Sequence, residues 1–146
     1  GAAHKHAIVT VIERKSGFAV IAKVSRKTAE QVSNAIIDRL APLASRVKSL
    51  TYDNGKEFAE HAKIDIALKS TSYFADPFAS WQRGTNENFN GLLRQYIPKK
   101  RHLSSVTDKE LKMIEDRLNH RPRKRLGFKT PFQVFYESLN RVALHT

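Results

Sequence analysis

Two acidic residues stand where a side chain can serve as a metal ligand. Asp53 closes the strand-like run 49–52 and is followed by Asn-Gly, so its carboxylate is expected at the rim of a sheet. Glu87 begins an amphipathic helix, where the helix dipole and the free backbone N–H groups keep a carboxylate ionised. Ionised carboxylates are the ligands that Mg²⁺ prefers in proteins. The pair predicts a site for a divalent cation.

Each of these residues also has an ordinary structural explanation. Asp-Asn-Gly is typical of a turn, in which Asp53 would form an Asx-turn or cap the following helix. A glutamate in the first turn of a helix, such as Glu87, is commonly only a partner of the helix dipole. Their combination favours the metal site, because 33 residues separate the two acids in a chain that is otherwise strongly basic. Two ions about 3.5–4 Å apart can activate a water or a 3′-hydroxyl and stabilise the leaving oxygen at a phosphodiester.

The charge of the chain indicates a polyanionic partner. Lys and Arg number 26 against 14 Asp and Glu, which gives a formal net charge of +12. The basic residues concentrate in 98–102 and 121–129 and form no single amphipathic helix, so nucleic acid is favoured over a membrane surface. No stretch approaches the roughly 18–20 apolar residues of a membrane span, and the absence of cysteine excludes thiolate chemistry. We expect one soluble, intracellular domain.

The apolar patterns predict an α/β domain in which helices cover a mixed sheet. Thr28 with Gln31, Thr107 with Glu110 and Thr130 with Gln133 are capping-box patterns that predict three helix starts. The segment from Lys56 to about Leu68 is expected to be a helix with Phe58, Ala62 and Ile66 inward. In the helix that begins near Glu87, the apolar face is expected to carry Phe89, Leu92, Leu93, Tyr96 and Ile97. The expected strands are 7–13, 18–24, 47–52 and 71–75.

Five ordered motifs resemble a known family. They are 51–58 (TYDNGKEF), 84–88 (GTNEN), 91–96 (GLLRQY), 118–127 (LNHRPRKRLG) and 130–131 (TP). Together they resemble the catalytic core of DDE transposases of bacterial insertion sequences, especially the group typified by insertion sequence thirty, and of retroviral integrases. The resemblance implies an RNase H-like fold, dependence on Mg²⁺ or Mn²⁺, nicking at transposon ends and transfer of a 3′-hydroxyl into target DNA. It also implies action at the nucleoid in the bacterial cytoplasm.

The resemblance assigns roles to individual residues. Asp53 would be the second acid of the catalytic triad and Glu87 the third, and both would bind the metal. Residues inside the matching motifs would contact DNA or orient the metal ligands: Asn54, Asn86, Asn90 and Arg94. The positive charge of the basic segments, rather than the resemblance, predicts phosphate contacts through Lys99, Lys100, Arg101, Arg121, Arg123 and Lys124. The Arg121-Pro122 element has a second interpretation, which is that it fixes the crossing of the last two helices.

The chain departs from the family pattern at its start. The family carries its first catalytic Asp on a central strand before the hairpin, and this sequence opens with the hairpin. The only acids before Asp53 are Glu13, Glu30 and Asp38, and none is a credible replacement. We therefore expect 1–146 to be an N-terminally truncated catalytic core that binds metal weakly and performs no strand transfer. The alternatives are a non-catalytic DNA-binding or assembly module, and a nuclease of the RNase H type that cuts without joining.

A sheet without its central strand would expose two strand edges, which are templates for pairing with another chain. We predict a homo-oligomer, in the simplest case a dimer, or an altered pairing of the N-terminal strands. Sedimentation measures the oligomeric state directly. A monodisperse monomer in which every sheet edge is covered would contradict this expectation.

Overall fold

The computed structural model describes residues 6–52, 60–74, 89 and 91–137. Residues 91–96 and 131–137 are also helical, and single 3₁₀ turns occur at Ala41–Leu43, Leu103–Ser105 and Lys124–Leu126. The main elements are β1 (Ala7–Glu13), β2 (Ala19–Val24), α1 (Ala29–Leu40), β3 (Ser49–Tyr52), α2 (His61–Leu68), β4 (Thr71–Phe74) and α4 (Asp108–Asn119).

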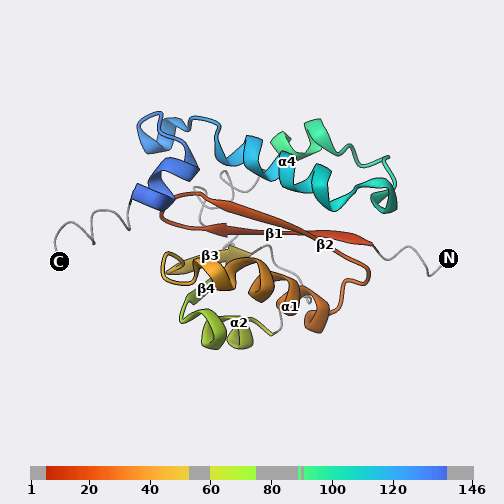
Figure 1. Cartoon of the computed structure of the whole chain (residues 1–146), viewed down its shortest axis with the longest axis horizontal. Helices are drawn as coiled ribbons and strands as arrows, with labels where there is room; N and C mark the ends of the chain where they lie inside the picture. The colour runs from red at the N-terminus through yellow and green to blue at the C-terminus, as the bar shows by residue number, and fades with distance from the viewer. Residues whose placement is uncertain (1–5, 53–59, 75–88, 90, 138–146) are drawn as a thin grey trace.

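The four strands form one mixed sheet in the order β2-β1-β3-β4 (Figure 1). β1 runs antiparallel to both β2 and β3, whereas β3 and β4 are parallel. β1 pairs with β3 directly, from Val11 opposite Tyr52 to Glu13 opposite Leu50. This direct pairing is the second of the two arrangements expected from the sequence, while the oligomeric state stays a prediction.

The β1–β2 turn is closed by a buried carboxylate. Glu13 accepts hydrogen bonds from the Ser16 backbone N–H at 2.9 Å and from the Ser16 hydroxyl at 2.7 Å. Gly17 supplies the positive φ of +75° that the turn requires, a conformation that other residues rarely adopt. Glu13 is therefore a turn-forming residue, which agrees with its rejection as a replacement for the first catalytic acid.

Helices cover both faces of the sheet, with α1 and α2 on one side and α4 on the other (Figure 1). Successive β2 residues point to opposite faces, so Val20 joins the core cluster under α1 while Ala19 and Ile21 join the cluster under α4. Burial on both faces explains why β2 reads as a continuous apolar run. The fold is thus a three-layer α/β/α arrangement.

The three predicted helix starts are confirmed. The Thr28 and Thr107 hydroxyls accept from the backbone N–H groups of Gln31 and Glu110, at 3.2 and 3.0 Å. Only the third pattern closes in both directions, because Thr130 also donates its backbone N–H to Gln133 at 2.9 Å.

The predicted inward face of the second helix is wrong. α2 buries Ile64 and Leu68, whereas Ile66 is 80% exposed and Ala62 is also exposed. Phe58 lies outside the described residues. The error is one of phase: counting helical steps from Phe58 selected one stripe, but α2 packs through the i, i+4 pair on another.

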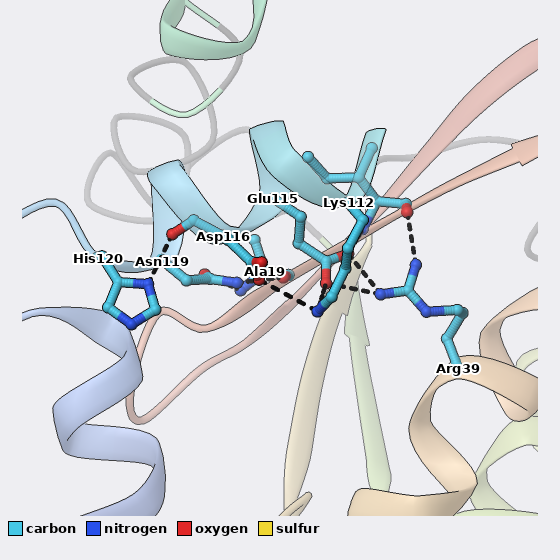
Figure 2. Close-up of polar contacts among 8 residues, drawn as sticks. Ala19, Arg39, Lys112, Glu115, Asp116, Asn119 and His120 are labelled. Carbon is cyan, nitrogen blue, oxygen red and sulfur yellow. Dashed lines mark hydrogen bonds and ion pairs between the residues drawn. The ribbon is translucent and has the colours of Figure 1, made fainter. Parts of the chain in front are cut away.

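α4 covers the outer edge of β2 with polar side chains (Figure 2). Asn119 accepts from the Ala19 N–H and donates to the Ala19 carbonyl, both at 2.8 Å. Two positions along, Glu115 accepts from the Ile21 N–H at 2.8 Å, and Arg39 of α1 donates to the Ile21 carbonyl at 2.9 Å. Arg39 also binds both Glu115 oxygens, at 2.6 and 2.8 Å. Side chains thereby replace the neighbouring strand that this edge lacks.

We expect Asn119→Ala to lower the free energy of unfolding by about 2 kcal/mol or more, because two buried backbone groups of Ala19 lose their partner. Chemical denaturation monitored by circular dichroism measures the change. Asp116→Asn is the matched control, since Asp116 is an exposed residue of the same helix. Equal stabilities of the two variants would contradict the edge-covering role.

Candidate functional site

The described part of the candidate metal site is the strand that leads to it. β3 ends at Tyr52, so Asp53 follows immediately, but Asp53 itself lies outside the described residues. β3 and β4 are parallel, and the carboxyl ends of parallel strands meet at the same edge of a sheet. The ends of β3 and β4 that lead to residues 53 and 75 therefore lie at one edge of the sheet.

A hydrogen-bonded group ties Tyr52 at the end of β3 and Ser72 near the start of β4 to Asp65 of α2. The Tyr52 and Ser72 hydroxyls are hydrogen-bonded to each other at 3.1 Å. The Asp65 carboxylate accepts from the Ser72 hydroxyl at 2.8 Å, from the Ser72 backbone N–H at 3.1 Å and from the Ser70 hydroxyl at 2.8 Å. Tyr52 is fully buried, so its position is fixed by packing as well as by this network. Sequence reasoning missed the network, because no short motif marks a contact between residues 20 apart.

Burial raises the pKa of Tyr52 to about 12. The hydrogen bond from Ser72 opposes this shift, and the negative charge of Asp65 adds to it. The phenol is therefore neutral at physiological pH and acts as a structural group.

The helix expected after Glu87 is present at 91–96, and its apolar face is the predicted one. Phe89, Leu92, Leu93 and Ile97 are buried in the cluster under α4, and Tyr96 packs against it. Gly91 and Arg94 lie on the exposed side, as expected, and Arg94 donates only a long hydrogen bond of 3.4 Å to the Ile97 carbonyl. Glu87, Asn86 and Asn90 lie outside the described residues, as does Asn54.

The first basic segment contains two exposed lysines and one arginine that is bound within the protein. Lys99 and Lys100 are exposed in the turn after Ile97. Arg101 instead binds both oxygens of Glu110, with Nη2 at 2.7 Å from Oε2, and these hydrogen bonds hold the pKa of Glu110 below its usual value. Arg101 therefore fixes this turn to the start of α4.

The second basic segment likewise contains exposed and bound cations. Arg123 is partly buried and donates to the Leu118 carbonyl at 2.9 Å. Burial lowers the pKa of its guanidinium, with smaller contributions in the same direction from Arg121 and Arg125. Arg121 and Lys124 are exposed and make no ion pair within the described part of the chain. Arg123 thus has a structural role in the connection after α4, whereas phosphate contact by the exposed Arg121 and Lys124 stays a prediction.

The two basic segments lie at opposite ends of α4 (Figure 1). Arg101 contacts Glu110 near the start of the helix, and Arg123 contacts Leu118 near its end. A helix of 12 residues is about 18 Å long. The exposed lysines before α4 and the exposed cations after it therefore lie at the two ends of this helix and form distinct surfaces.

Over the described residues, no group of three or more His, Asp or Glu side chains is placed to hold a metal ion, and no helix is long and apolar enough to cross a membrane. The two predicted ligands, Asp53 and Glu87, are outside that set.

The fold matches solved integrase structures. The catalytic core domain of BIV integrase aligns with 97% of this chain and 99% of its own length, with a TM-score of 0.59 and 22% identity. A chain of the simian T-cell lymphotropic virus intasome in complex with PP2A regulatory subunit B56 gamma aligns with 90% of this chain and 52% of its own, with a TM-score of 0.61 and 18% identity. The architecture is that of an integrase catalytic core.

Sequence comparison finds transposases as relatives, although no family model matches the chain. The transposase for insertion sequence element IS4351 of Bacteroides fragilis is 46% identical over 140 residues, which are 96% of this chain and 43% of that protein. The transposase InsI for element IS30A of Escherichia coli K12 is 44% identical over 128 residues, or 87% of this chain and 33% of that protein. The chain is a homologue of the IS30-family transposases and spans less than half the length of these relatives.

We expect the stability of the metal-free protein to fall as pH rises from about 10 through 12. Folding raises the pKa of Tyr52 from its ordinary value of 10.0 to about 12, so between these values the unfolded chain ionises the phenol and the folded chain does not, which favours unfolding. Urea unfolding between pH 8 and 12 measures the loss, and Tyr52→Phe should remove part of it.

Ser72→Ala should shift the titration of Tyr52 itself to higher pH. It removes the hydrogen bond that lowers the pKa of Tyr52, so phenolate absorbance should appear at higher pH than in the unaltered chain. A Tyr52 titration that is unchanged by Ser72→Ala would contradict the assigned contact.

Proposed function

We propose that this chain is the catalytic core of a transposase that cuts DNA at transposon ends and joins the 3′-hydroxyl to target DNA in a metal-dependent reaction. The observation that carries the proposal is 46% identity over 140 residues to a transposase, on a fold shared with integrase cores. These relatives are more than twice as long as the part that matches this chain, so the reaction is proposed for the chain as one part of such an enzyme.

Asp53 and Glu87 are the proposed metal ligands. Both are carboxylates, the donor type that suits Mg²⁺ or Mn²⁺. Asp53 directly follows the buried end of β3, and Glu87 precedes a helix whose apolar side is fixed in the core under α4. A rigid strand and a packed helix are suitable supports for ligands that must be held in place. A bound divalent ion would supply charge stabilisation at the reacting phosphodiester.

The exposed cations are the proposed phosphate contacts. Lys99, Lys100, Arg121 and Lys124 face solvent, whereas Arg101 and Arg123 are held by Glu110 and by the Leu118 carbonyl. We therefore assign Arg101 and Arg123 to positioning the two basic segments. Asn54, Asn86, Asn90 and Arg94 keep their proposed roles at the DNA or beside the metal ligands.

The chain on its own is proposed to lack strand-joining activity. Of the acids that precede Asp53, Glu13 is bound to Ser16 in the hairpin turn, and Glu30 and Asp38 are exposed residues of α1. None of these three acids lies at the sheet edge where β3 ends. Robust Mg²⁺-dependent joining of a DNA with a labelled 3′ end by these 146 residues would contradict this, and cutting without joining would favour an RNase H-type nuclease.

We expect Asp53→Asn and Glu87→Gln each to weaken Mn²⁺ binding by the chain, because each removes one of the proposed ligands. Electron paramagnetic resonance of free Mn²⁺ during titration measures the binding. Asp38→Asn is the matched control, since it removes one exposed carboxylate from α1. Mn²⁺ affinities that are the same in all three variants would count against the site.

The same variants should leave metal-free DNA affinity intact, while the double variant Lys99→Ala/Lys100→Ala should reduce it. Fluorescence anisotropy at several salt concentrations should show a fall of about two in the slope of log affinity against log salt. Lys63→Ala/Lys69→Ala, which removes two exposed lysines from α2 and its end, is the control. Retained metal binding with no affinity for DNA would favour a different partner.

A further inference from the structure

The loop after α4 holds an aromatic side chain in solvent by means of a constrained backbone. Phe128 is 70% exposed and has φ of +67°, directly after Gly127 at +64°. A left-handed conformation is ordinary for glycine and rare for a bulky residue. Such outliers persist where the surrounding structure fixes them, and they cluster at functional positions. Phe128 gains little from burial in return, so its conformation needs another explanation.

Hydrogen bonds fix the backbone on both sides of Phe128. Its own N–H donates to the Arg123 carbonyl at 2.9 Å, and the Arg123 N–H donates to the Lys129 carbonyl at 3.0 Å. The Lys129 N–H donates to the Leu126 carbonyl at 3.2 Å. The Lys129 ammonium also binds Glu137 of the following helix at 3.1 Å. The aromatic ring is therefore presented by a closed loop that is anchored at both ends.

The charged residues around Phe128 in the sequence are all basic. Residues 121–129 contain five Lys or Arg residues and no acid. Arg123 and Lys129 are engaged within the protein, and Arg125 lies against the hairpin turn, where its Nη2 would be 3.0 Å from a Cβ at Gly17. Arg121 and Lys124 are exposed and belong to the same short segment as Phe128. A partner for this surface must offer negative charge and a flat apolar face together.

Nucleic acid offers that combination, because phosphates attract the cations and an unpaired base can stack on an aromatic ring. An apolar protein surface would instead bury Arg121 and Lys124 without partners, which is costly. We propose that Phe128 stacks on an unpaired base of bound DNA while Arg121 and Lys124 contact the flanking phosphates. This inference rests on the proposed function for its DNA partner, and adds a base-contacting residue at the end of α4 away from Lys99 and Lys100.

The test compares two DNA duplexes that each contain one 2-aminopurine. This base is unpaired in the first duplex and paired in the second. Phe128→Gly accepts the left-handed backbone without strain, so it should fold at least as stably as the unaltered chain. It should nevertheless bind the duplex with the unpaired base about five-fold more weakly or worse, with the fully paired duplex little affected. Quenching of 2-aminopurine on binding should be lost in Phe128→Gly and kept in Phe128→Tyr.

Two control variants separate stacking from charge and from general apolar contact. Ile66→Ala removes another exposed apolar side chain, at 80% exposure, and should bind both duplexes as before. Lys124→Ala should weaken both duplexes alike and lower the salt slope by about one, whereas Phe128→Gly should leave the slope unchanged.

Four results would overturn the inference. Phe128→Gly could bind the unpaired-base duplex normally while Lys124→Ala weakens binding, which would leave the proposed function intact. Phe128→Gly could weaken both duplexes equally, which would exclude base stacking. A change in self-association by sedimentation, with DNA binding unaltered, would instead assign Phe128 to contact with a second copy. Failure of the unaltered chain to bind either duplex would reject the DNA partner itself.

Discussion

The contact between α4 and the edge of β2 is the constraint that determines where the two basic segments lie. Asn119 and Glu115 take the places of a neighbouring strand at Ala19 and Ile21, and Arg39 links the same carboxylate to α1. These contacts fix the direction of α4 across the sheet. Because each basic segment is bound to one end of α4, through Arg101 and through Arg123, their separation is set by this one helix.

The same logic assigns different work to residues of one chemical type. Arginine serves as a partner of a buried carboxylate, as a brace for a turn and as a solvent-facing cation within a chain of net charge +12. Burial distinguishes these uses. Arg123 donates a hydrogen bond to the Leu118 carbonyl from a partly buried position, where burial disfavours its charge. Arg121, two residues earlier, is exposed to solvent. Composition alone indicates a polyanion as partner, and only the contacts indicate which cations are free to meet it.

The sequence predicted most elements because their signals are local. The hairpin, the three capped helices and the apolar face containing Leu92 and Ile97 follow from spacing within a few residues. The phase of α2 was wrong because its first turn gave no cap to count from. The roles of Asn119 and Tyr52 could not be predicted, since each depends on a partner brought near by the fold, 100 residues away for Asn119 and 20 residues away for Tyr52. Asp53 and Glu87 were found by motif and are still untested by geometry.

The ladder between β1 and β3 has a consequence for the order of folding. Three residue pairs join these strands, against six between β1 and β2 and four between β3 and β4. The hairpin closes a loop of few residues, whereas the β1–β3 ladder joins Ile12 to Thr51. Loop closure costs more entropy for the longer connection and is repaid by fewer hydrogen bonds. The topology therefore favours early formation of the β1–β2 hairpin. The pairing of β1 with β3 forms later, once α1 has packed against the hairpin and the parallel strands.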